Sequence, residues 1–173
     1  LIPGSGVADM DHSVFSSFGF GPGQEVLLSA NFRTLAEELS ARGFAVVRYN
    51  KRHVTGPNQA DFSRLFQLSL ADFLADAAAV VEAAIAHPKV DRERLYLYGW
   101  SEGSTLAATL AAQRGDIAGL ILQTPVVFPW KETFVYQVFE VGWPFLMSVA
   151  EEGYIPPGAL GRAMASDAGL VAK

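Results

Sequence analysis

The chain has 173 residues, about the size of one domain, and its net charge of −5 comes from scattered acidic residues rather than from an acidic run. Hydrophobic residues make up 50% of the sequence and charged residues 18%, below the roughly 25% usual for soluble domains, so we expect a buried central sheet. The sequence has no basic stripe for nucleic acid and no apolar stretch of the roughly 20 residues that a membrane span needs. Because cysteine is absent, disulfides, thiolate metal sites and a cysteine nucleophile are excluded, and no compartment is indicated.

The first part of the chain predicts a strand end, a loop and a helix, in that order. Residues 1–24 are rich in Gly, Ser, Pro and Asp, a composition typical of a long loop that follows a strand. Loops of this length are usually functional. Apolar residues at helical spacing then predict a helix over residues 31–42, with Asn31 as its N-cap and Gly43 at the C′ position.

A strand, a loop and the most regular helix of the sequence are predicted next. Residues 44–50 are β-branched and aromatic, which predicts a short, buried parallel strand. Residues 51–68 are predicted to form a loop. Apolar residues then recur every three or four positions over residues 69–87, and Pro88 ends this helix.

Three further segments complete an alternating pattern of helices and strands. We predict a strand over residues 94–99, a helix of small residues over 102–114 and a strand over 117–125. Such alternation indicates an α/β fold with a doubly wound, mostly parallel sheet and right-handed crossovers. We therefore assign residues 1–125 to one core α/β segment.

After Pro125 the sequence becomes dense in aromatic residues and loses strand alternation. We interpret residues 126–173 as a helical lid or cap insertion, because the segment is short and has no obvious core of its own. Its aromatic side chains are candidates to line an acyl or alcohol pocket, although packing within the lid explains them equally well. The pocket candidates are Trp100, Trp130, Phe134 and Trp143. Phe128, Tyr136, Phe139 and Phe145 belong to the same candidate set.

The motif that points to chemistry is GWSEG, residues 99–103, which matches G-x-S-x-G. In this motif a serine lies on a tight turn between a strand and a helix, with its hydroxyl exposed above the sheet. The predicted strand before it and the predicted helix after it supply that setting, which makes Ser101 the candidate nucleophile. In the alternative, Ser101 only caps a closely packed helix. That explains the serine but not both Gly99 and Gly103.

A candidate oxyanion hole combines two loops. The backbone N–H of Glu102, the residue after the nucleophile, is the first candidate donor. The Glu102 carboxylate lies in the first turn of a helix, where the helix dipole favours negative charge, so its side chain has a structural interpretation as well. The second candidate donor is the Ser5 N–H in residues 3–6, which lie at a strand end. Here the alternative is a glycine-rich turn with no catalytic meaning.

These motifs resemble those of the α/β-hydrolase superfamily, in particular the serine aminopeptidase-like and dienelactone-hydrolase-like esterases. GSGVADMD resembles their GSG-x-x-D-x-D loop, RYNKR resembles a charged strand end, and DRERLYLYGWSEG resembles D-x-x-R-L-x-L-x-G-x-S-x-G. The resemblance covers residues 1–125. It implies an α/β-hydrolase fold, Ser101 as nucleophile, and Ser5 and Glu102 as oxyanion donors. The implied reaction is hydrolysis of a small-molecule carboxylic ester, thioester or amide, without a metal or cofactor.

The partners that such a serine needs are not evident in the sequence. In this fold an acid and then a histidine follow the nucleophile, yet no histidine follows Ser101. His87 is predicted to lie at a helix end or on the surface, and His53 in a solvated loop. His12, in the same loop as Ser5, is the candidate stand-in base.

Neither later aspartate fits the position of a triad acid, which is the end of a later strand. Asp116 is expected in a turn between a helix and a strand, and Asp167 near the end of the sequence. We therefore expect a sheet truncated at both ends. The acid and the histidine would then lie on a C-terminal portion outside this sequence, or on a complementary chain or segment. An inactive binding module and an acyltransferase or haloperoxidase-like enzyme on the same scaffold are the alternatives.

Overall fold

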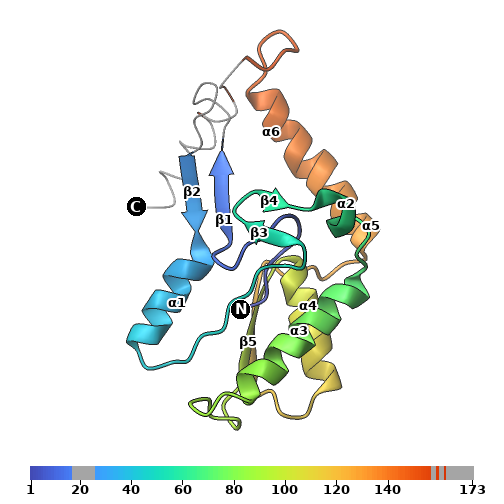
Figure 1. Ribbon diagram of the computed structural model, residues 1–173. Coiled ribbons are helices and arrows are strands. Elements are labelled where there is room, and N and C mark those ends of the chain that lie inside the picture. The colour runs from blue at the N-terminus through green and yellow to red at the C-terminus, as the bar shows by residue number, and fades with distance from the viewer. Residues whose placement is uncertain (17–25, 157–158, 160–161, 163–173) are drawn as a thin grey trace. The chain divides into compact units, whose positions relative to one another are not determined.

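A computed structural model gives the structure of the chain (Figure 1). It describes residues 1–16 and 26–156, together with residues 159 and 162. No helix in this described part is both long enough and apolar enough to cross a bilayer.

The chain divides into two compact units, which are described separately below. The first unit comprises residues 1–14 and 29–126, and the second comprises residues 15–28 and 127–173. All of the residues around Ser101 discussed below belong to the first unit.

A parallel sheet at the centre of the first unit positions the candidate nucleophile. Strand β5 (Tyr96–Trp100) pairs in parallel with β6 (Gly119–Gln123). Ile2 adds to the other edge of β5: its N–H donates to the Tyr98 carbonyl at 2.8 Å, and its carbonyl accepts from the Trp100 N–H at 3.2 Å. The start of the chain therefore runs alongside the strand that leads to Ser101.

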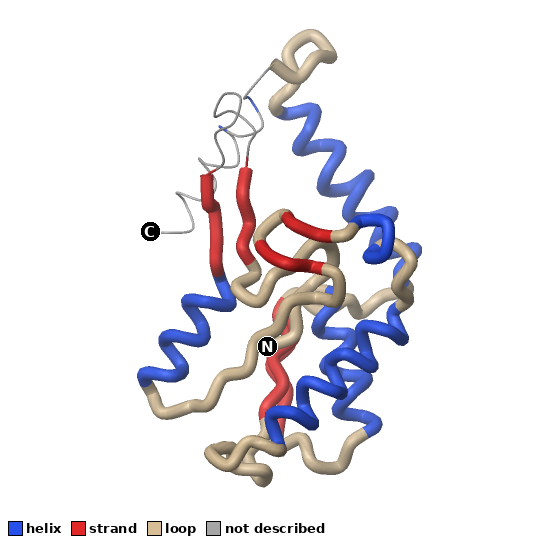
Figure 2. Tube along the Cα trace, viewed as in Figure 1, coloured by secondary structure: helices blue, strands red, loops and turns tan. Residues whose placement is uncertain are grey.

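Two helices, α3 (Leu70–Ile85) and α4 (Glu102–Gln113), lie side by side next to β5 (Figure 2). Their small and apolar residues form one core with the sheet. Its buried members are Ile2, Ala77, Val81, Leu97, Leu106, Ala107 and Leu110. The predicted helices and strands in this region are confirmed, with ends that differ by at most two residues.

Helix α3 begins with a capping box. The Ser69 Oγ accepts a hydrogen bond from the Asp72 N–H at 3.3 Å, and the Asp72 carboxylate accepts from the Ser69 N–H at 2.8 Å. These contacts satisfy backbone donors that a helix start otherwise leaves without an acceptor. Hydrogen bonds from the Ser69 hydroxyl and N–H, in that order, lower the pKa of Asp72.

We predict that Ser69→Ala lowers the free energy of unfolding by about 1 kcal/mol, the usual effect of losing an N-cap side chain. Because the folded-state pKa of Asp72 lies below its unfolded value, its contribution is full above the unfolded pKa. That contribution disappears as pH falls through the folded pKa. Urea unfolding at neutral and acidic pH measures both effects. Ser40→Ala, on an exposed position of helix α1, serves as the control and should change stability by less than about 0.5 kcal/mol.

Helix α1 (Asn31–Ala41) confirms the predicted helix but corrects its N-cap. Ala30 occupies the N-cap position. Asn31 is the first helical residue, and its side chain accepts a hydrogen bond from the Ser29 hydroxyl instead of from the helix backbone. At the other end Gly43 has φ +87° and donates its N–H to the Ser40 carbonyl at 3.0 Å, so the predicted C′ glycine is confirmed.

The predicted strand over residues 44–50 is wrong within the described part of the chain, where this segment is irregular. A strand requires a neighbouring strand to complete its ladder. Instead, the Leu1 backbone nitrogen donates to the Val47 carbonyl at 2.8 Å, and Phe44 and Val47 are exposed. The α/β class is supported, but the predicted doubly wound sheet is not seen. The strands of the described residues form two-stranded sheets, and only the Ile2 bridge extends one of them.

Two segments that we predicted as loops contain regular structure. Strand β1 (Ser13–Ser16) lies in the first of them and pairs with β2 (Val26–Ala30). In the second, β3 (Val54–Gly56) and β4 (Gln59–Ala60) form an antiparallel hairpin, and α2 (Phe62–Leu65) follows. These elements are very short, so they give little of the periodicity from which a strand or helix is predicted.

The second unit contains a helical segment. Helix α5 (Trp130–Val135), the π-helix η1 (Tyr136–Gly142) and helix α6 (Trp143–Ser148) follow one another directly. Trp130, Phe134 and Trp143 are exposed in it. The assignment of this segment as a lid stays a prediction.

Candidate active site

Ser101 connects β5 to α4 in a strained backbone conformation, with φ 52° and ψ −119°. Residues other than glycine rarely adopt positive φ, and such strain is retained where the surrounding structure enforces it. The Ser101 N–H donates to the Gln123 carbonyl at 2.9 Å, and the Ser101 carbonyl accepts from the Ser104 N–H at 2.8 Å. Hydrogen bonds to β6 and to the start of α4 therefore hold the Ser101 backbone in this conformation.

The buried hydroxyl of Ser104 adds two further bonds to this turn. Its Oγ donates to the Gly99 carbonyl at 2.8 Å and lies 3.0 Å from the Gln123 carbonyl, so it bridges the two neighbouring strands under the elbow. Sequence reasoning missed this role. A serine in a helix-forming run gives no local sign that its partner is a strand carbonyl.

The two glycines of the motif are required by backbone contacts. A Cβ atom on Gly99 would lie 2.3 Å from the Gly103 carbonyl oxygen, and a Cβ atom on Gly103 would lie 2.3 Å from the Ile2 carbonyl oxygen. Backbone atoms held in a sheet and a helix cannot move far enough to relieve such contacts. Both positions therefore exclude any larger residue.

The loop that begins at Gly4 passes directly beside the candidate nucleophile. A Cβ atom on Gly4 would lie 3.3 Å from Ser101 Cβ and 3.1 Å from the Trp100 carbonyl oxygen. Ser5 follows and is exposed. Glu102 is the first residue of α4, a position whose N–H has no intrahelical acceptor. The structure thus brings the Ser5 loop, Ser101 and the free end of α4 to the same end of β5.

His12 lies against the same loop. Its ring stacks on Trp100 with 4.6 Å between centroids and an interplanar angle of 16°, and it lies 5.1 Å from the buried ring of Phe32. Its Nε2 is 3.8 Å from the position of a Cβ on Gly4. Burial lowers the pKa of His12, which favours the neutral imidazole. Its Nδ1 is buried and has no hydrogen-bond partner among the described residues.

The other two histidines make local contacts. His87 is exposed just beyond α3, and its Nδ1 accepts a hydrogen bond from the Lys89 N–H at 3.3 Å. The His53 carbonyl accepts from the Asp61 N–H at 2.9 Å, next to the β3–β4 hairpin. These contacts agree with the helix-end and loop positions expected from the sequence.

A buried ion pair next to the nucleophile is a second feature that sequence reasoning missed. The Lys51 ammonium donates to Glu102 Oε1 at 2.8 Å, and the two side chains are only 4% and 17% exposed. The ammonium also lies 4.5 Å from the centroid of the Phe73 ring. The RYNKR segment indicated a charged strand end, but nothing local in the sequence identifies Glu102 as its partner.

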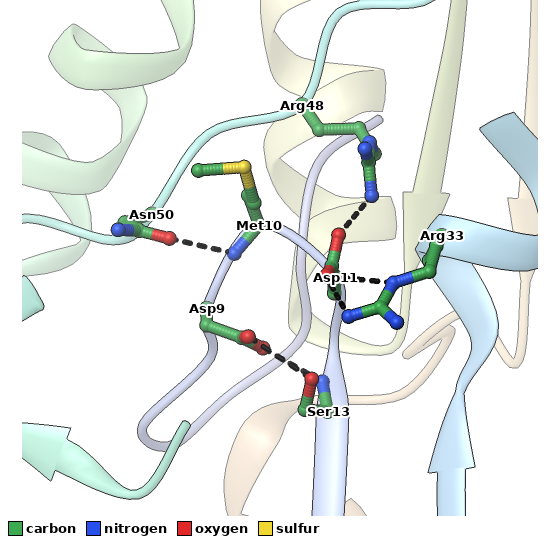
Figure 3. Close-up of polar contacts among 7 residues, drawn as sticks. All are labelled: Asp9, Met10, Asp11, Ser13, Arg33, Arg48 and Asn50. Atoms are coloured by element: carbon green, nitrogen blue, oxygen red, sulfur yellow. Dashed lines mark hydrogen bonds and ion pairs between the residues drawn. The ribbon is translucent and has the colours of Figure 1, made fainter. Parts of the chain in front are cut away.

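The two aspartates of the Gly-rich loop bond to different kinds of partner (Figure 3): Asp11 connects the loop to distant residues, whereas Asp9 bonds within the same segment. Asp11 accepts hydrogen bonds from Arg33 of α1 at 2.7 Å and from Arg48. Asp9 is buried and accepts from the N–H and the hydroxyl of Ser13 at 2.7 and 3.0 Å. Both carboxylates therefore have structural partners close at hand.

The remaining predicted pocket residues belong to the second unit. Trp130, Phe134 and Trp143 stay candidates for a substrate pocket, while Trp100 is the pocket candidate that the structure places beside Ser101. No group of three or more metal-binding side chains occurs in the described part of the chain.

A strained serine between a parallel strand and a helix, flanked by two required glycines and adjoined by a second Gly-rich loop, defines an α/β-hydrolase elbow. The family model Hydrolase_4, described as serine aminopeptidase S33, matches residues 28–173. The chain therefore belongs to this α/β-hydrolase family, which confirms the resemblance seen in the sequence. The match does not include the Ser5 loop. A search of curated proteins found no match.

Proposed function

We propose that this chain carries the nucleophile of a serine hydrolase that cleaves a carboxylic ester, thioester or amide through an acyl-enzyme on Ser101. The observation that carries the proposal is the positive φ of Ser101 between Gly99 and Gly103. Membership of a serine aminopeptidase family supports hydrolysis as the reaction class. The strained turn exposes the serine Oγ above the sheet. A nucleophile needs that exposure, whereas a serine with only a structural role does not.

In the proposed reaction the Ser101 Oγ attacks the acyl carbon as a base takes its proton. The tetrahedral oxyanion accepts hydrogen bonds from the Ser5 and Glu102 N–H groups. Collapse expels the protonated leaving group, and water then hydrolyses the acyl-enzyme. We expect the histidine base and its acid to come from outside these 173 residues, and His12 is the candidate base within them.

The stacked rings of Trp100 and His12 supply the part of the substrate site that is nearest to the nucleophile. An indole face is apolar, which suits an acyl chain or the alcohol part of an ester. We propose that the substrate lies against Trp100.

We predict that a fluorophosphonate probe labels Ser101 in the full-length protein. Such probes phosphonylate serines that have an activated hydroxyl and an oxyanion hole. Mass spectrometry of the digested protein should find the adduct on Ser101 alone. The buried Ser104 serves as the internal control, since its hydroxyl is engaged with two carbonyls. An unlabelled Ser101, under conditions that label a known serine hydrolase, would favour the inactive binding module.

A further inference from the structure

We propose that Lys51 is a positioning residue that holds the two loops of the oxyanion hole in register. It acts through Glu102 on one side and through Ala8 on the other. The inference rests on the proposed function, because it assumes that Ser5 and Glu102 are the oxyanion donors. It assigns a role to a residue that is not itself part of the G-x-S-x-G motif.

The first link is the buried ion pair. Lys51 reaches Glu102 with its ammonium, at 2.8 Å from Oε1, and both charges are largely removed from water. Glu102 follows the nucleophile directly, so its side chain and its N–H extend from the same Cα atom. A fixed carboxylate therefore limits how far the first peptide of α4 can turn. The direction of the Glu102 N–H depends on that peptide.

The second link is a backbone hydrogen bond. The Lys51 N–H donates to the Ala8 carbonyl at 3.2 Å, and Ala8 is buried in the same loop as Ser5. The Lys51 carbonyl in turn accepts from the Val54 N–H at 3.0 Å, which ties the residue to the start of β3. Lys51 thus contacts both sides of the proposed oxyanion hole. Its N–H bonds to the loop that holds Ser5, and its ammonium bonds to the side chain of Glu102.

The residues around the Lys51 ammonium hold it in one specific position. It lies over the ring of Phe73, 4.5 Å from the centroid, and Phe73 packs against the main core of the unit. A buried ion pair gives little net stability, since desolvation offsets the attraction between its charges. The geometry that the pair imposes beside the nucleophile is therefore a better account of its role than stability.

The test compares Lys51→Met with the double variant Lys51→Met/Glu102→Gln. Methionine keeps the apolar stem against Phe73 but removes the ammonium, which leaves the Glu102 carboxylate unpaired. In the double variant neither group is charged, so the stability lost in Lys51→Met should largely return. If Lys51 positions the hole, the double variant still reacts slowly. We expect kcat to fall by about 10 to 100-fold, at or below the effect of losing one oxyanion donor, with KM nearly unchanged.

Two further variants sharpen the comparison. Lys51→Arg keeps the charge and should recover part of the lost kcat. Arg52→Met removes the neighbouring cation, whose partners Asp72 and Asp76 lie on α3, and it should leave kcat unchanged. The readouts are kcat and KM on a chromogenic ester, the rate of fluorophosphonate labelling, and the melting temperature of each full-length variant.

The outcomes separate the two proposals. If the wild-type protein is not labelled at Ser101, the proposed function fails. If the wild type is labelled but the double variant reacts at the wild-type rate, the proposed function stands and the positioning role of Lys51 is overturned. Slow labelling of a double variant that melts at the wild-type temperature supports the positioning role of Lys51.

Discussion

Ser101→Ala should reduce ester turnover by about 10⁶-fold, the size typical of the loss of a catalytic serine, while leaving the melting temperature nearly unchanged. The Oγ that would attack the substrate is removed, and no other group in the elbow can replace it. The structural effect is small, because no hydrogen bond of the Ser101 hydroxyl occurs within the described residues and alanine keeps the same Cβ. Steady-state kinetics and thermal unfolding measure the two effects separately.

Ser101→Gly provides the matched control for the strain at this position. Glycine adopts φ 52° without the steric cost that a Cβ imposes, which is about 1 to 3 kcal/mol for such conformations. Greater freedom of the unfolded chain offsets about 0.4 to 1 kcal/mol of this gain. Ser101→Gly should therefore be inactive yet more stable than Ser101→Ala. Retained turnover in both variants would show that another nucleophile acts.

The second large effect is expected for Gly103→Ala, which should lower the free energy of unfolding by about 3 kcal/mol or more. The new Cβ would lie 2.3 Å from the Ile2 carbonyl oxygen and 2.6 Å from that of Pro3. Relief of these contacts requires α4 to move away from the first residues of the chain. Because the Ser5 loop begins just beyond Pro3, the same movement should also reduce turnover. Urea unfolding and steady-state kinetics check the two parts.

Gly115→Ala is the matched control, because a Cβ at Gly115 meets no atom within 4 Å. It should leave turnover unchanged and alter the free energy of unfolding by at most about 1 kcal/mol in the stabilising direction. Equal stabilities of the Gly103 and Gly115 variants would contradict the close approach of α4 to Ile2.

The features that the sequence predicted well are those encoded by neighbouring residues. The helix start at Ser69 and the C′ glycine at Gly43 depend on contacts within a few positions of the chain, so the pattern of residue types is enough to predict them. The GWSEG elbow can be recognised from five consecutive residues, although Gly103 is required by the distant Ile2 carbonyl. The elbow is also the most specific part of the family resemblance, which the family-model match over residues 28–173 confirms.

The features that the sequence did not predict depend on distant partners. Lys51 and Glu102 are 51 positions apart, and no periodicity links them. The segment 44–50 has the composition of a strand, but composition does not supply the neighbouring strand that a ladder needs. The Asn31 side chain accepts a hydrogen bond from Ser29, two residues before it, instead of capping the helix, and local residue preference alone does not exclude that choice.

The pairing of Ile2 with β5 has a consequence for how the site responds to thermal motion. Two hydrogen bonds connect Ile2 to the strand that ends at Ser101, and the Ser5 loop begins two residues further on. We therefore expect a shift of β5 to move Ser101 and the start of that loop together. The distance between the proposed attacking atom and the proposed Ser5 donor would then change little as the sheet moves. Little reorganisation would be needed when charge develops on the substrate, which is the condition for effective electrostatic catalysis.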